Sequence, residues 1–107
     1  MKVKIHAHNV DITESLRSYA EAKMLKLDRH FDRIHEARLD IDAAARRGLD
    51  SVKDLALHVH INGNLLEGRV KSRDLMTGVD LVVDKVDEQL RRRKERLTDH
   101  RPNPRGA

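Results

Sequence analysis

Hydrophobic and polar residues alternate strictly at the start of the chain. This alternation over Lys2–His8 predicts a strand with one apolar face and one polar face. After a connector over 9–12, apolar residues recur every three or four positions, which predicts an amphipathic helix over about 13–28. Asp11 or Thr13 can cap this helix. Its expected buried face consists of Leu16, Ala20, Met24 and Leu27, with Phe31 packing beyond its end.

Three further segments alternate with a period of two and predict three more strands, over 37–43, 51–61 and 66–71. Residues 44–50 are expected to form a loop. The pair Asn62-Gly63 is preferred in tight type I′ turns, so the last two strands should form a hairpin. The residues expected to face the core are Ala37, Leu39, Ile41, Ala43, Leu55, Leu57, Val59, Ile61, Leu66, Gly68 and Val70.

The last long periodic segment runs from Asp74 to about Leu97 and predicts a second amphipathic helix. Ser72 or Asp74 can cap it. Gly78 lies inside this helix at a cost of up to ~1 kcal/mol relative to alanine, which predicts close packing at that point. Residues 98–107 hold both prolines and are expected to form a flexible tail, which leaves 1–97 as one domain. The expected apolar face consists of Leu75, Val79, Val82, Val83, Val86, Leu90 and Leu97.

The order of elements predicts an α+β fold of two layers, βαβββα, with a four-stranded mixed sheet and two helices packed on one face. A right-handed crossover through the first helix makes the first two strands parallel, and the later connections are antiparallel. Both helices then run in the same direction. The other face of the sheet is expected to be polar and open to water.

Composition narrows the class of protein. The chain has 107 residues, 37% of them charged and 38% hydrophobic, which fits a single soluble domain. It has no cysteine, so disulfides and thiolate metal sites are excluded. No apolar run is long enough for a signal peptide or a membrane span. We therefore expect a cytoplasmic protein without membrane association.

The histidines and hydroxyl residues do not form a convincing chemical site. His6, His8, His58 and His60 share the outer face of the predicted sheet, but about two strand widths, ~9–10 Å, separate the two pairs. That distance is too great for four ligands of one metal ion. The chain offers no nucleophile paired with a base and no glycine-rich phosphate loop. We expect no catalysis, no cofactor and no small-molecule substrate.

Positive charge is concentrated at the end of the second helix. The net charge of the chain is +4, and the Lys and Arg in excess of Asp and Glu all fall after residue 84. On a helical projection, Lys85, Gln89, Arg92 and Arg96 follow one flank, while the acids at 80, 84 and 87 follow the other. The first helix is sorted likewise, with Lys23, Lys26 and Arg29 on one side. This sorting indicates a surface for a polyanion; the alternative is a solvated helix surface whose cations complement the helix dipole.

The near absence of aromatic residues restricts how nucleic acid could be bound. With one Tyr and one Phe, the chain has no platform for stacking single-stranded bases. Folded RNA would have to be bound through charge and shape along the phosphate backbone. About six to eight phosphate contacts predict an affinity that falls ~10³-fold or more between about 50 and 200 mM salt.

Two segments carry a family resemblance that covers residues 2 to about 97. The segment 9–34 reads NVDITESLRSYAEAKMLKLDRHFDRI and resembles the first-helix signature of the ribosome hibernation promoting factors and the ribosome-associated translation inhibitors. The segment 80–97 reads DLVVDKVDEQLRRRKERL and, with Asp74, resembles the closing helix of that family. The chain ends soon after this helix and so resembles the short form, without a C-terminal dimerisation domain.

The resemblance implies the βαβββα fold and a partner, the small ribosomal subunit with its ribosomal RNA. A family member would bind between head and body in the decoding channel, block the messenger and transfer RNA sites, and inhibit translation in stationary phase or stress. We expect it to be monomeric when free. The resemblance assigns RNA binding to Lys23, Lys26, Lys85, Arg92, Lys94 and Arg96, to which we add Arg29, Arg33 and Arg93.

Two departures and two alternatives accompany this interpretation. Met76 stands where members often have an aromatic residue, and Glu88 stands where some carry a cation. The first alternative is a general binder of double-stranded RNA. The second is a protein-interaction module whose basic helix docks on an acidic partner, since an older family name describes modulators of a sigma factor.

Overall fold

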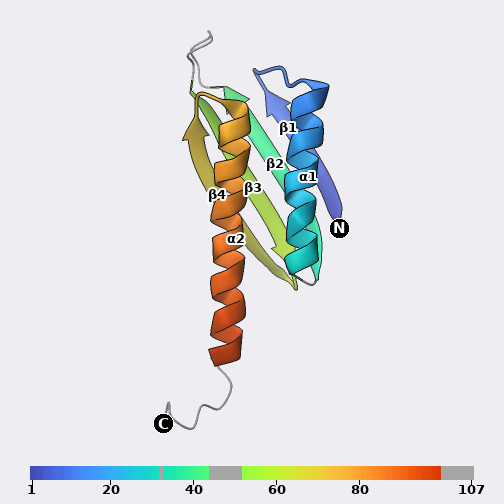
Figure 1. Ribbon diagram of the computed structural model, residues 1–107, viewed down its shortest axis with the longest axis vertical. Coiled ribbons are helices and arrows are strands. Elements are labelled where there is room, and N and C mark those ends of the chain that lie inside the picture. Colours follow the sequence, from blue (N-terminus) through green and yellow to red (C-terminus); the bar gives the residue numbers. More distant parts are fainter. Residues whose placement is uncertain (32, 44–51, 100–107) are drawn as a thin grey trace.

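Two helices cover one face of a four-stranded sheet in the computed structural model of the chain (Figure 1). The structure describes residues 1–31, 33–43 and 52–99, and the side chains of 94–99 are not described. The elements are β1 (Lys2–His8), α1 (Glu14–His30), β2 (Ile34–Ala43), β3 (Lys53–Ile61), β4 (Asn64–Ser72) and α2 (Leu75–Asp99). The predicted two-layer α+β class is confirmed. No helix in the described residues is long and apolar enough to cross a membrane.

The sheet has the predicted mixed topology. Its strand order is β1-β2-β3-β4, with β1 parallel to β2 and the other pairs antiparallel. The register places Ile5 beside Leu39, Leu39 beside Leu57, and Leu57 beside Gly68, so one row crosses the whole sheet under the helices. Figure 1 shows that α1 and α2 run in the same direction, as predicted. The C-terminal ends of both helices therefore point toward the same end of the molecule.

The core lies between this sheet face and the two helices. All four apolar residues predicted to face inward from α1 are buried, and Phe31 is buried beyond its end. Gly78 is packed as closely as predicted, because a Cβ there would lie 2.7 Å from Cδ1 of Leu55. Ala43, Leu66, Val70 and Leu75 were expected inside but are only half-buried, and the side chain of Leu97, also expected inside, is not described. Leu66 and Val70 belong to the edge strand β4, which has a neighbouring strand on one side only.

Local side-chain contacts decide between the predicted caps. Thr13 caps α1, because its hydroxyl accepts a hydrogen bond from the Leu16 amide at 3.1 Å. Asp74 caps α2, because Oδ2 accepts from the Thr77 amide at 2.9 Å and from the Thr77 hydroxyl at 2.7 Å. These hydrogen bonds, from the hydroxyl and then from the amide, lower the pKa of Asp74. Each helix extends two residues further than predicted, to His30 and Asp99.

The hairpin between β3 and β4 turns at the predicted residues. Asn62 has φ 50° and Gly63 has φ 81°, the positive pair that a type I′ turn requires. β2 begins earlier than predicted, at Ile34, because a bulge between Ile34 and Glu36 breaks the alternation on which the prediction rested. β3 begins at Lys53 rather than 51, and β4 at Asn64 rather than 66. The loop predicted over 44–50, residue 51 and tail residues 100–107 lie outside the described residues.

Candidate functional site

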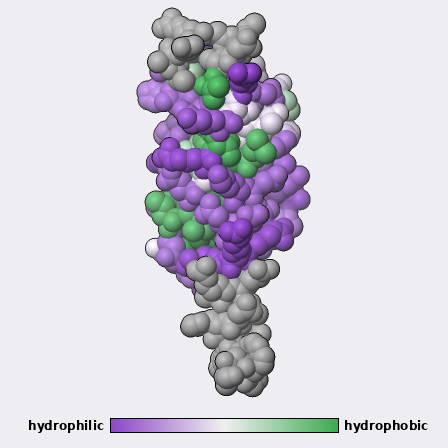
Figure 2. Space-filling view, turned by 90° about the vertical axis from the view of Figure 1, so that its left-hand side faces the viewer, coloured by the Kyte–Doolittle hydropathy of each residue, from purple (hydrophilic) through white to green (hydrophobic). Residues whose placement is uncertain are grey.

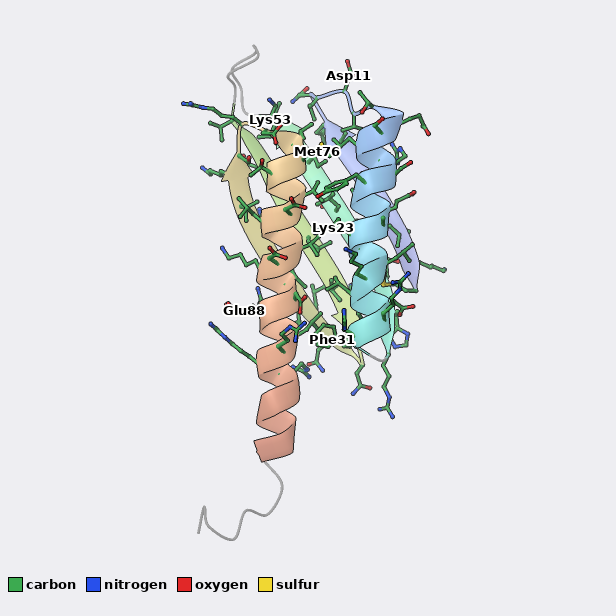
Figure 3. All side chains as sticks on the ribbon, in the orientation of Figure 1. Asp11, Lys23, Phe31, Lys53, Met76 and Glu88 are labelled. Atoms are coloured by element: carbon green, nitrogen blue, oxygen red, sulfur yellow. The ribbon has the colours of Figure 1, made fainter. Side chains whose placement is uncertain are left out.

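The basic side of α1 faces the acidic side of α2. Lys23 lies between the two helices in Figure 3, and its Nζ is 3.3 Å from Oδ1 of Asp80. The Tyr19 hydroxyl donates a hydrogen bond to the same carboxylate oxygen. The lateral sorting of charge seen in the sequence is therefore real, but it places the cations of one helix against the acids of the other. Lys23 therefore fronts the groove between the helices, whereas Lys85 lies on the side of α2 next to β4.

This contact between the helices changes the acid–base properties of its members. The hydrogen bond from Tyr19, and then that from Lys23, lower the pKa of Asp80 despite its partial burial. The same bond to Asp80 raises the pKa of Tyr19. Partial burial acts to lower the pKa of Lys23, but the hydrogen bond and charge of Asp80 outweigh it and leave that pKa raised. All three groups thus keep their usual charge at neutral pH, and Lys23 is held in place by its partner.

Lys85, on the other side of α2, is also held by the fold. Its Nζ donates to the main-chain carbonyl of Arg69 in β4 at 3.0 Å. One helical turn later, Nε2 of Gln89 donates to the carbonyl of Glu67 at 3.0 Å. We call Lys23 and Lys85 the held pair, because each ammonium group has a specific acceptor within the protein.

Further along α2, two ion pairs join residues that are four apart on the helix. Arg91 Nε lies 2.7 Å from Oδ1 of Asp87, and Arg92 lies 3.0 Å from Glu88. The guanidinium of Arg91 also sits 6.0 Å from the ring centroid of Phe31, just past the end of α1. Arg92 and Glu88 are both largely exposed, so their pairing is weak and Arg92 can exchange Glu88 for another anion.

Four further cations lie near the C-terminal end of α1 or, in the case of Arg93, two residues after the α2 residue that contacts Phe31. Lys26, Arg29 and Arg33 are exposed and Arg93 is half-buried. Within the described residues, none of these four has a carboxylate at salt-bridge distance. Arg33 adopts a left-handed φ of 71°, and its carbonyl accepts from the amide of Asn62, which ties this residue to the hairpin. We call Lys26, Arg29, Arg33 and Arg93 the basic end.

Two residues expected to bind RNA cannot be placed in this scheme. Lys94 and Arg96 belong to α2, which continues past the sheet in Figure 1. Their side chains lie outside the described residues. Their backbone belongs to the part of α2 that follows Arg93.

The open face of the sheet carries a charge network that the sequence did not reveal. Asp40 of β2 lies between the two histidine pairs. Its carboxylate is 3.9 Å from His6 and 3.3 Å from His58. His58 also lies 3.6 Å from Glu67. No group of three or more His, Asp or Glu side chains within 1–31, 33–43 and 52–93 has the geometry to hold a metal ion. The network links β1 to β4 across the sheet, and we interpret it as side-chain pairing between strands that stabilises the sheet.

Sequence reasoning missed Arg91 and the link between Tyr19 and Asp80. Arg91 was not among the residues expected to bind RNA, yet its contact with Phe31 brings it beside the basic end. The signal was Phe31 itself, an aromatic residue at a helix end that a neighbouring cation can cover. Tyr19 and Asp80 are 61 residues apart, and no local pattern connects them.

The fold and the arrangement of charges define a class of small α+β protein with one cationic end, and known structures share this fold. A ribosomal subunit interface protein from Coxiella burnetii superposes with a TM-score of 0.75 at 24% identity. The similarity covers 89% of this chain and 99% of that one. At this level of identity the comparison supports the fold alone.

Sequence comparison identifies the family. Residues 3–98 match the family described as Sigma 54 modulation protein / S30EA ribosomal protein, and the chain belongs to this family. A ribosome hibernation promoting factor from Azotobacter vinelandii is 30% identical over 107 residues, which is all of this chain and 95% of that protein. One from Salmonella typhimurium is 32% identical over 100 residues, covering 94% of this chain and all of that protein. The resemblance drawn from the two helices is confirmed.

Proposed function

We propose that this protein is a ribosome hibernation factor. It binds the small ribosomal subunit in the decoding channel, blocks the sites of messenger and transfer RNA, and inhibits translation in stationary phase or stress. The observation that carries the proposal is the match to proteins named ribosome hibernation promoting factor, which extends over nearly the whole length of both chains. The family description, which names a ribosomal protein, points to the same partner.

The distribution of cations supports contact with ribosomal RNA through the basic end. Lys26, Arg29, Arg33 and Arg93 have no carboxylate partner within the described residues, so a phosphate would not have to displace one. Breaking an existing ion pair or hydrogen bond subtracts from the free energy of a new contact. We therefore assign the main phosphate contacts to these four residues. Arg92, whose partner Glu88 is exposed, continues this surface along α2, as do Lys94 and Arg96 by their position in the helix.

The held pair has a different role in this proposal. Lys23 and Lys85 were expected to bind RNA because of the resemblance. Each ammonium group already has an acceptor, the carboxylate of Asp80 and the carbonyl of Arg69 respectively. We propose that both residues mainly support the fold and contribute to RNA binding only through their long-range charge.

Sedimentation with purified ribosomal particles tests the function. We expect the protein to pellet with the small subunit at low salt, to be released as salt is raised, and to inhibit translation in a purified system. An unrelated RNA duplex of equal concentration serves as the control. If the protein stays in the supernatant with small subunits at low salt, the proposal is wrong. Equal affinity for the duplex and the subunit would instead identify a general binder of double-stranded RNA.

A second candidate function follows from the other half of the family description, which names modulation of sigma 54. In that case the basic surface would dock on an acidic protein. Nuclease treatment separates the two functions, because binding to ribosomal particles through RNA is lost when the RNA is digested and binding to an acidic protein is retained.

A further inference from the structure

The outer edge of β4 is a feature of the sheet that the proposed function does not use. β4 is the last strand in the sheet order, so one of its sides has no neighbouring strand. The carbonyls of Glu67 and Arg69 accept bonds from α2 rather than from β3, so they point to this open side. Unpaired backbone groups on an edge strand are a template for another strand.

Two side chains of α2 cover this edge. Lys85 and Gln89 are four residues apart on the helix, which is a rise of ~6 Å. The carbonyls that they reach, those of Arg69 and Glu67, are two residues apart on the strand, which is ~6.7 Å. The two spacings match, so one face of α2 can occupy successive open carbonyls. We call Lys85 and Gln89 the latch.

Gly68 allows the helix to come close enough for these bonds. It lies between the two carbonyls and faces α2, and a Cβ at this position would be 2.8 Å from Cγ2 of Val86. Val86 is fully buried and has little room to move. Any larger residue at position 68 would therefore move α2 away from the strand edge.

The sequence of β4 is self-complementary around Gly68. If two copies paired antiparallel through this edge with Gly68 opposite itself, Glu67 of each copy would lie opposite Arg69 of the other. Opposite charges directly across an antiparallel pair are favourable. In the monomer Glu67 and Arg69 pair with each other, so the dimer would exchange this contact within one strand for two equivalent contacts between copies. Leu65, the most exposed large hydrophobic residue in the described part of the chain at 56%, would be partly covered. Figure 2 views the molecule from this side and shows hydrophobic patches separated by hydrophilic surface.

We propose that the latch keeps the protein monomeric by covering a strand edge that otherwise pairs with a second copy of the same chain. Released from Lys85 and Gln89, the carbonyls of Glu67 and Arg69 accept from the amides of the partner's β4, and the two sheets become continuous. The dimer has two-fold symmetry, with the same surface on both sides. This proposal concerns the free protein and does not depend on ribosome binding.

The test removes both donors while keeping side chains of similar length. In the double variant Lys85→Met and Gln89→Met, the latch bonds are lost in both copies, and we expect the self-association constant to rise at least about 100-fold. Analytical ultracentrifugation should then show concentration-dependent formation of a species of twice the 12.3 kDa mass, where the unaltered protein remains a monomer. The matched control is Glu88→Met with Arg92→Met, an i,i+4 pair of the same helix whose side chains pair with each other, and it should remain monomeric.

A charge exchange tests the register of the pair. Adding Glu67→Lys to the latch-free variant places like charges opposite each other and should restore the monomer. Adding Arg69→Glu as well should restore the dimer. A folded latch-free variant that stays monomeric, or an unaltered protein that already dimerises through β4, would overturn the proposal. If the double variant does not fold, the single variants Lys85→Met and Gln89→Met, each retaining one bond, give the same test with a smaller expected rise.

Discussion

Lys23 and Arg29 were both assigned to the basic side of α1, but they lie about 120° apart around the helix axis and their surroundings differ. Lys23 sits beside α2 with its side chain 24% exposed and its ammonium group against Asp80. Arg29 lies in the last turn of α1, is exposed, and has no carboxylate partner within the described residues. The same contrast separates Lys85, bound to the β4 edge, from Arg93 two turns later. The basic residues of each helix are therefore of two kinds, distinguished by their neighbours in space.

The largest expected effect comes from removing the basic end. In a variant carrying Lys26→Gln, Arg29→Gln, Arg33→Gln and Arg93→Gln, four phosphate contacts are lost. At ~1–1.5 kcal/mol for each contact, the affinity for the small subunit should fall about 1000-fold or more. Sedimentation at fixed salt measures this loss, and circular dichroism checks that the fold is intact. A loss below about tenfold would show that the contacts lie elsewhere on the molecule.

The salt dependence of binding should change together with the affinity. Each phosphate contact adds ~0.7–0.9 to the slope of log affinity against log salt, so the same variant should lose about three units of slope. The held-pair variant, Lys23→Gln with Lys85→Gln, should keep nearly all of the slope. Equal slopes for the two variants would remove the distinction between the two kinds of cation.

A stability change of intermediate size is expected at Gly68. Gly68→Ala places a methyl group against the buried Val86 and should lower the free energy of unfolding by ~1–3 kcal/mol. Denaturant unfolding measures the change. Because the cause is overpacking, adding Val86→Ala should make the effect of Gly68→Ala smaller than it is in the unaltered protein. Two effects that simply add would mean that Gly68 does not set the distance between α2 and β4.

The smallest expected effect is at Asp80. Its lowered pKa contributes stability above the ordinary value of 3.8, and this contribution is lost as pH falls through the lowered value. The raised pKa of Lys23 contributes below the ordinary value of 10.5 and is lost as pH rises through the raised value. Asp80→Asn should therefore cost less than about 1 kcal/mol between about pH 5 and 9, since this carboxylate is 42% exposed, and almost nothing near pH 2. Unfolding curves at several pH values measure it, and a cost that does not change with pH would argue against the ion pair.

The fold was predictable because its information is local. Periodicity placed every helix and strand, and Asn62-Gly63 marked the hairpin. The largest error was at the start of β2, where a bulge puts Ile34 and Ala37 both in the core although they are three residues apart. Strict alternation cannot place two residues three positions apart on the same face, so the strand was predicted to begin only at residue 37.

The site was predictable only in part, because the role of a cation depends on groups far away in the sequence. Helical projection correctly sorted the charges of each helix. It could not show that Asp80 lies against Lys23, 57 residues earlier, or that Lys85 ends on a main-chain carbonyl of β4. Every residue has a backbone carbonyl, so the residue types along the chain do not show which carbonyl accepts a bond from Lys85. Grouping Arg29 with Lys23 on one basic side hid this difference until the neighbouring helix was in place.

The most direct test is a competition for small subunits between two variants of equal net charge, one lacking cations of the basic end and the other lacking the held pair. The variant Lys26→Gln with Arg29→Gln and the variant Lys23→Gln with Lys85→Gln each lose two positive charges. Both are mixed in equal amounts with a limiting quantity of small subunits, and the pelleted protein is quantified by mass spectrometry. We predict that the pellet contains the Lys23/Lys85 variant in at least about tenfold excess. Equal amounts, or an excess of the Lys26/Arg29 variant, would contradict the assignment of RNA binding to the basic end.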